Sequence, residues 1–438
     1  DSLAALLRDG VRLEDPNRDV GMTNFYLAYH GLNDAAIQSQ IAHFYLSACP
    51  RLGWIAPHCL APQLAAREER LRIGIVSSCL RDHTVGKFYR GMIEMLSRDR
   101  FEVIVFRPPH EKDMVAEAID RAADRAIEIP RDLYAARERI AAQRPHILFY
   151  PEIGMDPLIY FMAFARLAPV QCVGWGHPVT TGIPAIDYFI SAKTLESPCA
   201  QSHYSEQLIS LNRLPTYYIR PDFAAPPITR AQLGLPEDAR LYMCPQSLFK
   251  FHPDFDIALA TLLRRDPGGR LVLISGNSPH WSKLLAARIT NAFPDIADRV
   301  MFVPRIPQSE FFRLLQTADV LLDPPYFGGG NTTYEALAAG IPIVTWPGPF
   351  MRGRVTQACY KQMGFEALVA DSLDSYVEKA FSVANNAAQS SLLRTEITRR
   401  AAVLYEDGEA VKELERFFVA AHEARKGGRT IADYEAAS

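Results

Sequence analysis

Residues 71–76 read LRIGIV, an apolar run with a single charged side chain. A run of this length and composition is typical of a strand that is buried on both faces in a parallel sheet. The chain continues with SSCLRDH at residues 77–83 and then with a helical pattern of apolar residues from Thr84 to Leu96. A strand, a turn and a helix in this order predict one βα unit, which is the repeating element of a doubly wound sheet.

The same alternation occurs twice along the 438 residues, on either side of a proline-rich stretch. Short apolar runs that predict strands lie at residues 102–106, 146–150 and 170–174, and again at 241–244, 270–275, 300–303, 319–322 and 341–345. Residues 1–70 show helical spacing only. The pattern predicts an α/β protein with two Rossmann-like domains in tandem. Its expected parts are a helical N-terminal segment (1–70), a first Rossmann-like domain (71–215), a linker (216–238), a second Rossmann-like domain (239–400) and C-terminal helices (401–438).

Composition removes several classes of function. The chain has 47 Lys and Arg against 50 Asp and Glu, a net charge of −3, and no long run of one sign, so a broad nucleic-acid or anionic-membrane surface is not expected. The number of cysteines, 7, is odd and they form no CxxC pair, which argues against a disulfide framework or a structural zinc site. No stretch approaches the roughly 20 apolar residues that span a bilayer. We therefore expect a protein of a reducing compartment, the cytoplasm.

A glycine-rich turn follows one predicted strand of the second domain. Residues 323–335 read DPPYFGGGNTTYE. The glycines allow the backbone to approach a ligand, and a helix that starts at Asn331 or Thr332 as N-cap would direct its free amides at a diphosphate. Glu335, expected in the first turn of that helix, would accept two hydrogen bonds from a ribose. The alternative is a glycine-rich loop with ordinary helix capping. Neither GxGxxG nor GxxxxGK[ST] occurs in the chain, which leaves the nicotinamide and P-loop interpretations without their usual motif.

Three further side chains follow predicted strands. Lys250 lies in PQSLFKFHP (245–253), where a cation would neutralise a departing phosphate, although a single lysine near a helix start is commonly just exposed. His83 and His177 lie in strand-exit turns, where an imidazole can accept a proton near neutral pH. Loop histidines often have no chemical role, so these two remain candidates only.

Five segments, in order, resemble the O-linked N-acetylglucosamine transferase family of glycosyltransferases (family 41), across residues 71–384. They are GIVSSCLRDH (74–83), YPEIGM (150–155), RLAPVQ through GHPVTTG to IDY (166–188), FK (249–250) and the 323–335 turn through GIP (340–342). The resemblance implies a GT-B fold with an acceptor-side first domain and a second domain that binds the nucleotide sugar. It also implies no catalytic metal and no cofactor, because the UDP-sugar is itself the donor substrate.

The resemblance also assigns roles to residues. His83 stands at the place of the family's candidate base, which is otherwise assigned to donor binding, and Lys250 at the place of the lysine on the donor diphosphate. Glu335 would hold the ribose, and Thr332 and Thr333 would contact phosphate. The full set expected to bind the donor is Gln246, Ser247, Lys250, Gly330, Asn331, Thr332, Thr333, Glu335, His177 and Thr180.

The departures from the family pattern concern the substrate. Asn331 stands where animal members carry a histidine, and it resembles the asparagine of bacterial adhesin N-glucosyltransferases. SPINDLY-type O-fucosyltransferases share the Thr-Thr-x-Glu arrangement. The sequence thus predicts an inverting, metal-independent transfer of GlcNAc or another hexose from a UDP-sugar to Ser or Thr of a protein. Transfer to Asn, O-fucosylation, a nucleotide-sugar 2-epimerase and a non-catalytic nucleotide-sugar-binding scaffold are the alternatives, and the oligomeric state stays open.

Overall fold

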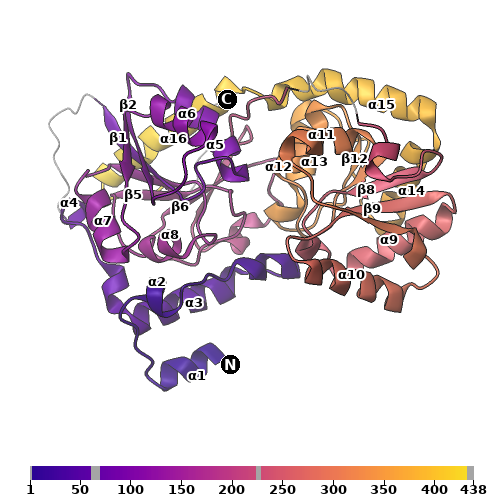
Figure 1. Ribbon diagram of the computed structural model, residues 1–438. Coiled ribbons are helices and arrows are strands. Elements are labelled where there is room, and N and C mark those ends of the chain that lie inside the picture. The colour runs from indigo at the N-terminus through magenta and orange to yellow at the C-terminus, as the bar shows by residue number, and fades with distance from the viewer. Residues whose placement is uncertain (1, 61–69, 223–227, 432–438) are drawn as a thin grey trace. The chain divides into compact units, whose positions relative to one another are not determined.

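A computed structural model describes residues 2–60, 70–222 and 228–431 (Figure 1). The chain divides into two compact units. Unit 1 comprises Asp1–Ala28, Leu32–Ile219 and Glu406–Ser438, and unit 2 comprises Tyr29–Gly31 and Arg220–Tyr405. Each unit contains one fully parallel sheet flanked by helices, as Figure 1 shows. The predicted pair of doubly wound α/β sheets is therefore confirmed.

The sheet of unit 1 has seven strands in the order β3-β2-β1-β4-β5-β6-β7. Its strands are β1 (Leu71–Val76), β2 (Phe101–Arg107), β3 (Arg125–Glu128), β4 (Ile147–Tyr150), β5 (Val170–Val173), β6 (Tyr188–Ala192) and β7 (Gln207–Leu211). The last four residues of β1 and all of β4 and β5 are buried, as their apolar runs predict. The sequence analysis did not identify β3, β6 and β7. The edge strand β3 reads RAIE and is largely exposed, so no apolar run marks it.

The helices of unit 1 come from both ends of the chain. The N-terminal segment forms α1 (Ser2–Arg8), α2 (Pro16–Asp19), η1 (Phe25–His30), α3 (Ala35–Ala48), η2 (Pro50–Gly53) and α4 (Pro57–Leu60), as expected for a helical region. The other α-helices of this unit are α5 (Thr84–Met95), α6 (Met114–Ala122), α7 (Leu133–Ala141), α8 (Pro157–Met162) and α16 (Gly408–Lys426). Phe418 of α16 packs edge-on against Phe149 of β4, with ring centroids 5.9 Å apart. Helix α16 thus contributes to the core around the first sheet.

The sheet of unit 2 has five strands in the order β10-β9-β8-β11-β12. The strands are β8 (Arg240–Cys244), β9 (Gly269–Ile274), β10 (Val300–Val303), β11 (Val320–Leu322) and β12 (Ile343–Val344). The helices are α9 (Pro253–Arg265), α10 (Pro279–Ala292), α11 (Gln308–Gln316), α12 (Asn331–Ala338), α13 (Val355–Met363), α14 (Leu373–Asn385) and α15 (Ala387–Arg400). Across the described part of the chain, no helix combines the length and the apolar character needed to traverse a bilayer.

Strand order locates the ligand-binding edge of each sheet. In unit 1 the order reverses between β1 and β4, and in unit 2 it reverses between β8 and β11. Ligands of open α/β sheets bind beyond the carboxyl ends of the strands at such a reversal. The turns that matter are therefore those after β1 and β4 in unit 1, and those after β8 and β11 in unit 2.

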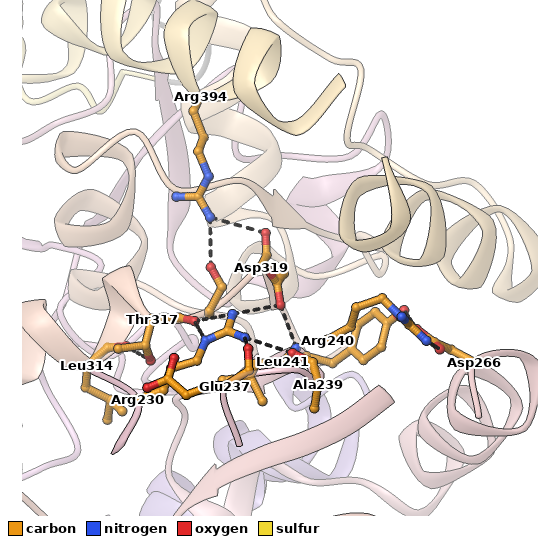
Figure 2. A network of polar contacts seen from close by, with 12 residues as sticks. Arg230, Glu237, Ala239, Arg240, Leu241, Asp266, Leu314, Thr317, Asp319 and Arg394 are labelled. Carbon is orange, nitrogen blue, oxygen red and sulfur yellow. Dashed lines mark hydrogen bonds and ion pairs between the residues drawn. The ribbon is translucent and has the colours of Figure 1, made fainter. Parts of the chain in front are cut away.

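The opposite edge of the second sheet is held by a polar network (Figure 2). Asp319, just before β11, accepts hydrogen bonds from the backbone N–H of Leu241 (2.7 Å) and from Arg230 Nη2 (2.9 Å). Arg394 of α15 donates to the carbonyl of Ala318 at 2.8 Å. These bonds satisfy backbone and charged groups where β8 and β11 begin, and they anchor α15 at the edge away from the candidate site.

Candidate active site

Lys250 lies in the turn after β8, within a short 3-10 helix (Leu248–Lys250). Its Nζ donates to Gln246 Oε1 at 2.9 Å and to the carbonyl oxygen of Gly328, in the turn after β11, at 2.8 Å. Nζ also lies 4.6 Å from the centroid of the Phe327 ring. The structure thus brings together the lysine and the glycine-rich turn that the sequence analysis singled out. An ammonium has three hydrogens, and these two bonds use two of them.

Burial controls the charge of this lysine. Burial lowers the pKa of Lys250 to about 8, while the nearby Asp323 carboxyl and Cys244 thiol act in the opposite direction. At pH 7 the side chain is therefore still a cation, in surroundings that hydrate it poorly. A cation of this kind interacts strongly with an incoming anion, because little water competes for it.

Asp323 shapes the turn that faces the lysine. Its carboxylate accepts hydrogen bonds from the Gly329 N–H at 2.6 Å and from Thr345 Oγ1 at 2.9 Å. A Cβ atom at Gly328 would lie 2.7 Å from Asp323 Oδ2, closer than real Cβ atoms approach an oxygen. Glycine at position 328 is thus required for the turn to close on Asp323 and present its carbonyl to Lys250.

Helix α12 begins at Asn331, at the end of this turn, but its N-cap differs from the prediction. Gly330 is the N-cap and Asn331 the first helical residue, so the prediction of Asn331 or Thr332 as N-cap is wrong. Gly330 has no side chain that could bond to the amides of the first turn, although the Thr333 N–H donates to the Gly330 carbonyl at 3.0 Å. A helix start without a side-chain cap suits an anionic ligand. Thr333 is buried, and its Oγ1 lies 2.9 Å from Thr356 Oγ1. Thr332 is half-buried in the first turn.

Glu335 is the fifth residue of α12 and therefore lies beyond its first turn, contrary to expectation. In a helix that starts at Asn331, the first turn ends at Tyr334. The side chain is buried, with 2% of its surface exposed, and Oε1 accepts a hydrogen bond from Asn331 Nδ2 at 2.6 Å. Asn331 and Glu335 are thus joined across one turn of the helix.

A hollow of about 200 Å³ lies beside this cluster, at the ends of β8, β9 and β10. Its lining includes the predicted residues Gln246 and Ser247 and also Phe249, which the family resemblance includes without a role. Three further lining side chains were missed by the sequence analysis: Trp281, Arg305 and Phe311. Arg305 follows β10, whereas Trp281 and Phe311 lie in α10 and α11, so no fixed spacing in the sequence marks them.

His83 in unit 1 is the N-cap of α5. Its Nδ1 accepts a hydrogen bond from the Val85 N–H at 3.2 Å. Burial lowers the pKa of His83, and the charges of Arg81 and Lys87 lower it further. The ring is therefore neutral at pH 7. Because Nδ1 supplies a lone pair to the helix, the neutral ring carries its proton on Nε2, which makes Nε2–H a hydrogen-bond donor rather than a base.

His177 and Thr180 are both buried in unit 1 and have partners there. His177 stacks on Phe25, with ring centroids 5.1 Å and planes 24° apart. Thr180 Oγ1 donates to Glu206 Oε2 at 2.6 Å. These contacts fix the turn after β5, and they favour a supporting role for both side chains.

Glu152 follows β4 and was not selected from the sequence, although it lies within the YPEIGM segment. The side chain is fully buried, and Oε1 accepts a hydrogen bond from Ser77 Oγ, in the turn after β1, at 3.0 Å. The Oε2 atom has no hydrogen-bond partner within the described chain. Burial raises the pKa of Glu152 to about 8, so the carboxyl is largely protonated at pH 7.

Comparison with known proteins identifies the family. The family model for glycosyl transferase family 41 matches residues 33–224 and 223–409. The chain belongs to glycosyl transferase family 41. The predicted family resemblance is thus confirmed over most of the chain.

Curated proteins from plants and bacteria align with the chain. A probable UDP-N-acetylglucosamine–peptide N-acetylglucosaminyltransferase SEC of Arabidopsis thaliana is 28% identical over 365 residues, which are 80% of this chain and 37% of that protein. A UDP-glucose:protein N-beta-glucosyltransferase of Actinobacillus pleuropneumoniae is 26% identical over 244 residues, 55% of this chain and 38% of that protein. The chain spans little more than a third of the length of these relatives.

Solved structures support the fold. A mutant of the Thermobaculum terrenum O-GlcNAc transferase superposes with a TM-score of 0.78 at 24% identity, covering 92% of this chain and 77% of that one. The Anabaena protein HepE, in complex with UDP and glucose, superposes with a TM-score of 0.52 at 11% identity, covering 80% of this chain and all of that one. The two parallel sheets flanked by helices match GT-B glycosyltransferases, which confirms the predicted fold class.

Proposed function

We propose that this family 41 chain transfers a hexose from a UDP-sugar to a side-chain hydroxyl of a protein, with inversion at the anomeric carbon and without a metal ion. The acceptor oxygen forms a bond to the anomeric carbon while the bond from that carbon to the diphosphate breaks. UDP leaves with the bonding electrons, and the acceptor's proton passes to solvent. The developing charge lies on the β-phosphate, so stabilisation of this phosphate is the main demand on the protein.

The observation that carries the proposal is the placement of Lys250. A poorly hydrated cation, bonded to the Gly328 carbonyl, lies in the same unit as the uncapped start of α12. The third hydrogen of its ammonium group and the first amides of the helix together suit a pyrophosphate. We assign Gln246 to holding Lys250 and Thr332 to contacting phosphate.

The hollow next to this cluster suits the base of the nucleotide. Phe249, Trp281 and Phe311 offer aromatic faces, and Gln246 and Ser247 offer polar atoms at its border. The Glu335 side chain is buried, which argues against its binding a ribose by itself. Its hydrogen bond with Asn331 supports a role in which the two side chains bind the ribose together.

The tautomer of His83 assigns it to donor binding. Its Nε2–H would donate to a phosphate or sugar oxygen, while Nδ1 remains bonded to the start of α5. His177 and Thr180 would support the turn after β5 rather than contact the donor.

The relatives set the choice of substrates to be tested. The plant relative is named for transfer from UDP-N-acetylglucosamine to a peptide, and the bacterial relative for transfer from UDP-glucose to a protein. We favour Ser or Thr as acceptor, and Asn331 keeps transfer to Asn as the second candidate.

The test is mass spectrometry of a host proteome incubated separately with the chain and UDP-GlcNAc, UDP-glucose or GDP-fucose, followed by mapping of the modified residues. Sugar on Ser or Thr supports the proposal, and sugar on Asn supports the second candidate. Epimerised nucleotide sugar formed without any acceptor would instead identify a 2-epimerase. UDP binding without transfer to any protein would identify a scaffold.

A further inference from the structure

Three residues of the N-terminal helical segment, Tyr29–Gly31, belong to unit 2. The Tyr29 ring stacks on Phe327, with centroids 4.5 Å and planes 24° apart. It also meets Phe249 edge-on, with centroids 4.8 Å apart. A segment more than two hundred residues before the glycine-rich turn therefore packs directly on two aromatic rings of the candidate site.

Phe327 lies beside the cation of the candidate site, and Phe249 lies beside its hollow. Lys250 Nζ is 4.6 Å from the centroid of the Phe327 ring. Phe249 lines the hollow assigned to the base and packs edge-on against Trp281, with centroids 5.4 Å apart. Tyr29 is thus the common neighbour of the ring beside the cation and of the ring beside the hollow.

The chain next to Tyr29 is fitted closely to the same turn. Gly31 has a φ of +70°, and a Cβ there would lie 2.9 Å from the Tyr326 ring. Tyr326 itself has a φ of 72°, which is unusual for a bulky residue, and its hydroxyl donates to Asp254 Oδ2 at 2.7 Å. A non-glycine residue in this conformation persists only where its surroundings hold it, and Gly31 is part of those surroundings.

We propose that Tyr29 is a positioning residue of the donor site, which orders Phe327 and Phe249 and thereby keeps water away from Lys250. The inference rests on the proposed function, since it assumes that a nucleotide diphosphate binds at Lys250. It adds that Tyr29, from the N-terminal segment, belongs to the part of the donor site that lies in unit 2.

The physical consequence concerns both affinity and protonation. Loss of the Tyr29 ring would free two side chains that must then be ordered when ligand binds, which weakens binding. It would also expose Phe327 and admit water next to Lys250, whose pKa is about 8 because of burial.

The groups that face Lys250 are the Asp323 carboxyl, the Cys244 thiol, Gln246 and the Gly328 carbonyl. None of them changes in the variant, so an upward shift in the pKa of Lys250 would report hydration.

The test compares Tyr29→Ala, Tyr29→Phe and the control Tyr26→Ala by calorimetric titration with UDP across pH 6.5 to 9.5, a range of roughly 1.5 units on either side of that pKa. Tyr26 lies on the same 3-10 helix but is 54% exposed and packs on Phe25. We expect Tyr29→Ala to bind UDP roughly tenfold more weakly, as the loss of two aromatic pairs implies. We also expect the pH above which its affinity falls to rise, while Tyr29→Phe and Tyr26→Ala match the parent in both respects.

Three results would overturn the inference. The first is unchanged UDP affinity in Tyr29→Ala. The second is weaker binding of Tyr29→Ala with an unchanged pH profile, which would reduce Tyr29 to a packing residue. The third is an equal loss of affinity in Tyr29→Phe, which would assign the effect to the hydroxyl. If the parent chain itself does not bind UDP, it is the proposed function that fails.

Discussion

Lys250 Nζ donates to the carbonyl oxygen of Gly328 over 2.8 Å, which joins the turn after β8 to the turn after β11. The lysine was selected from the sequence as a cation for a departing phosphate, and the glycine-rich turn as a backbone that can approach a diphosphate. The structure shows that each positions the other. The site in unit 2 should therefore respond to changes on either side of this bond.

Replacement of Lys250 by alanine should remove turnover while the protein remains folded. The side chain would provide charge to the leaving diphosphate in the transition state, and loss of one such donor commonly costs about 100-fold or more in kcat. The measurement is kcat with the best donor from the substrate screen, together with thermal unfolding. Lys361→Ala, which changes an exposed lysine of α13 in the same unit, is the matched control. An unchanged kcat in Lys250→Ala would refute the leaving-group role.

Gly328→Ala should reduce activity by displacing the same bond from the other side. The added methyl group would meet Asp323 Oδ2 at 2.7 Å, so the turn must move and carry its carbonyl away from Lys250. We expect weaker UDP binding and a lower kcat. Gly348→Ala is the control, since the atoms nearest to a Cβ at that glycine, both of Tyr326, would lie 4.0 Å away. Equal behaviour of the two variants would show that the closure of the turn on Asp323 is unimportant.

The buried parallel strands and the chemistry of their exits were predictable because both leave local patterns. The apolar run of β1 and the glycines of 323–335 are examples. The N-cap of α12 was assigned to the wrong residue, because a preference for Asn or Thr at the N-cap does not reveal that Gly330 adopts that position. Trp281 and Phe311 reach the hollow, and Tyr29 reaches Phe327, only through tertiary packing. No spacing in the sequence encodes such contacts.

Burial also gave Glu152 a property that its sequence context did not suggest. Its carboxyl has a pKa of about 8 in the folded protein, against 4.5 as an ordinary glutamate. Because the pKa of Glu152 is raised in the folded protein, the contribution of this carboxyl to the free energy of unfolding is fully present below pH 4.5. This contribution declines as the pH rises from 4.5 to 8, because Glu152 ionises first in the unfolded chain. The decline is roughly 1.4 kcal/mol for each pH unit of that window, as an upper bound.

Glu152→Gln should therefore flatten the pH dependence of stability. Gln cannot ionise, and it can still accept the hydrogen bond from Ser77. We expect the unfolding midpoint of this variant to exceed that of the parent at pH 8 and to approach it at pH 5. Glu117→Gln, at an exposed position of α6, should retain the parent's profile. Parallel profiles for Glu152→Gln and the parent would mean that Glu152 is ionised in the folded protein.

At the opposite edge of unit 2, Asp266 should make the fold sensitive to acid. Burial alone would raise the pKa of this side chain, which is 1% exposed, but hydrogen bonds from Arg240 (2.6 Å), Tyr242 (2.7 Å) and Asn385 (3.1 Å) lower it to about 2 (Figure 2 shows the Arg240 contact). A lowered pKa gives stability that is present above the unfolded value of about 3.9 and is lost as the pH falls toward 2.

Asp266→Asn should lower the free energy of unfolding by about 2 kcal/mol at pH 7, since three donors lose a charged acceptor. The gap between variant and parent should close near pH 2, when the parent carboxylate is also protonated. Urea unfolding at pH 7, 4 and 2.5 measures this, with Asp295→Asn, which breaks the exposed pair with Arg264, as a control that should change little. A gap that stays constant down to pH 2.5 would show that Asp266 stabilises the edge by its shape and not by its charge.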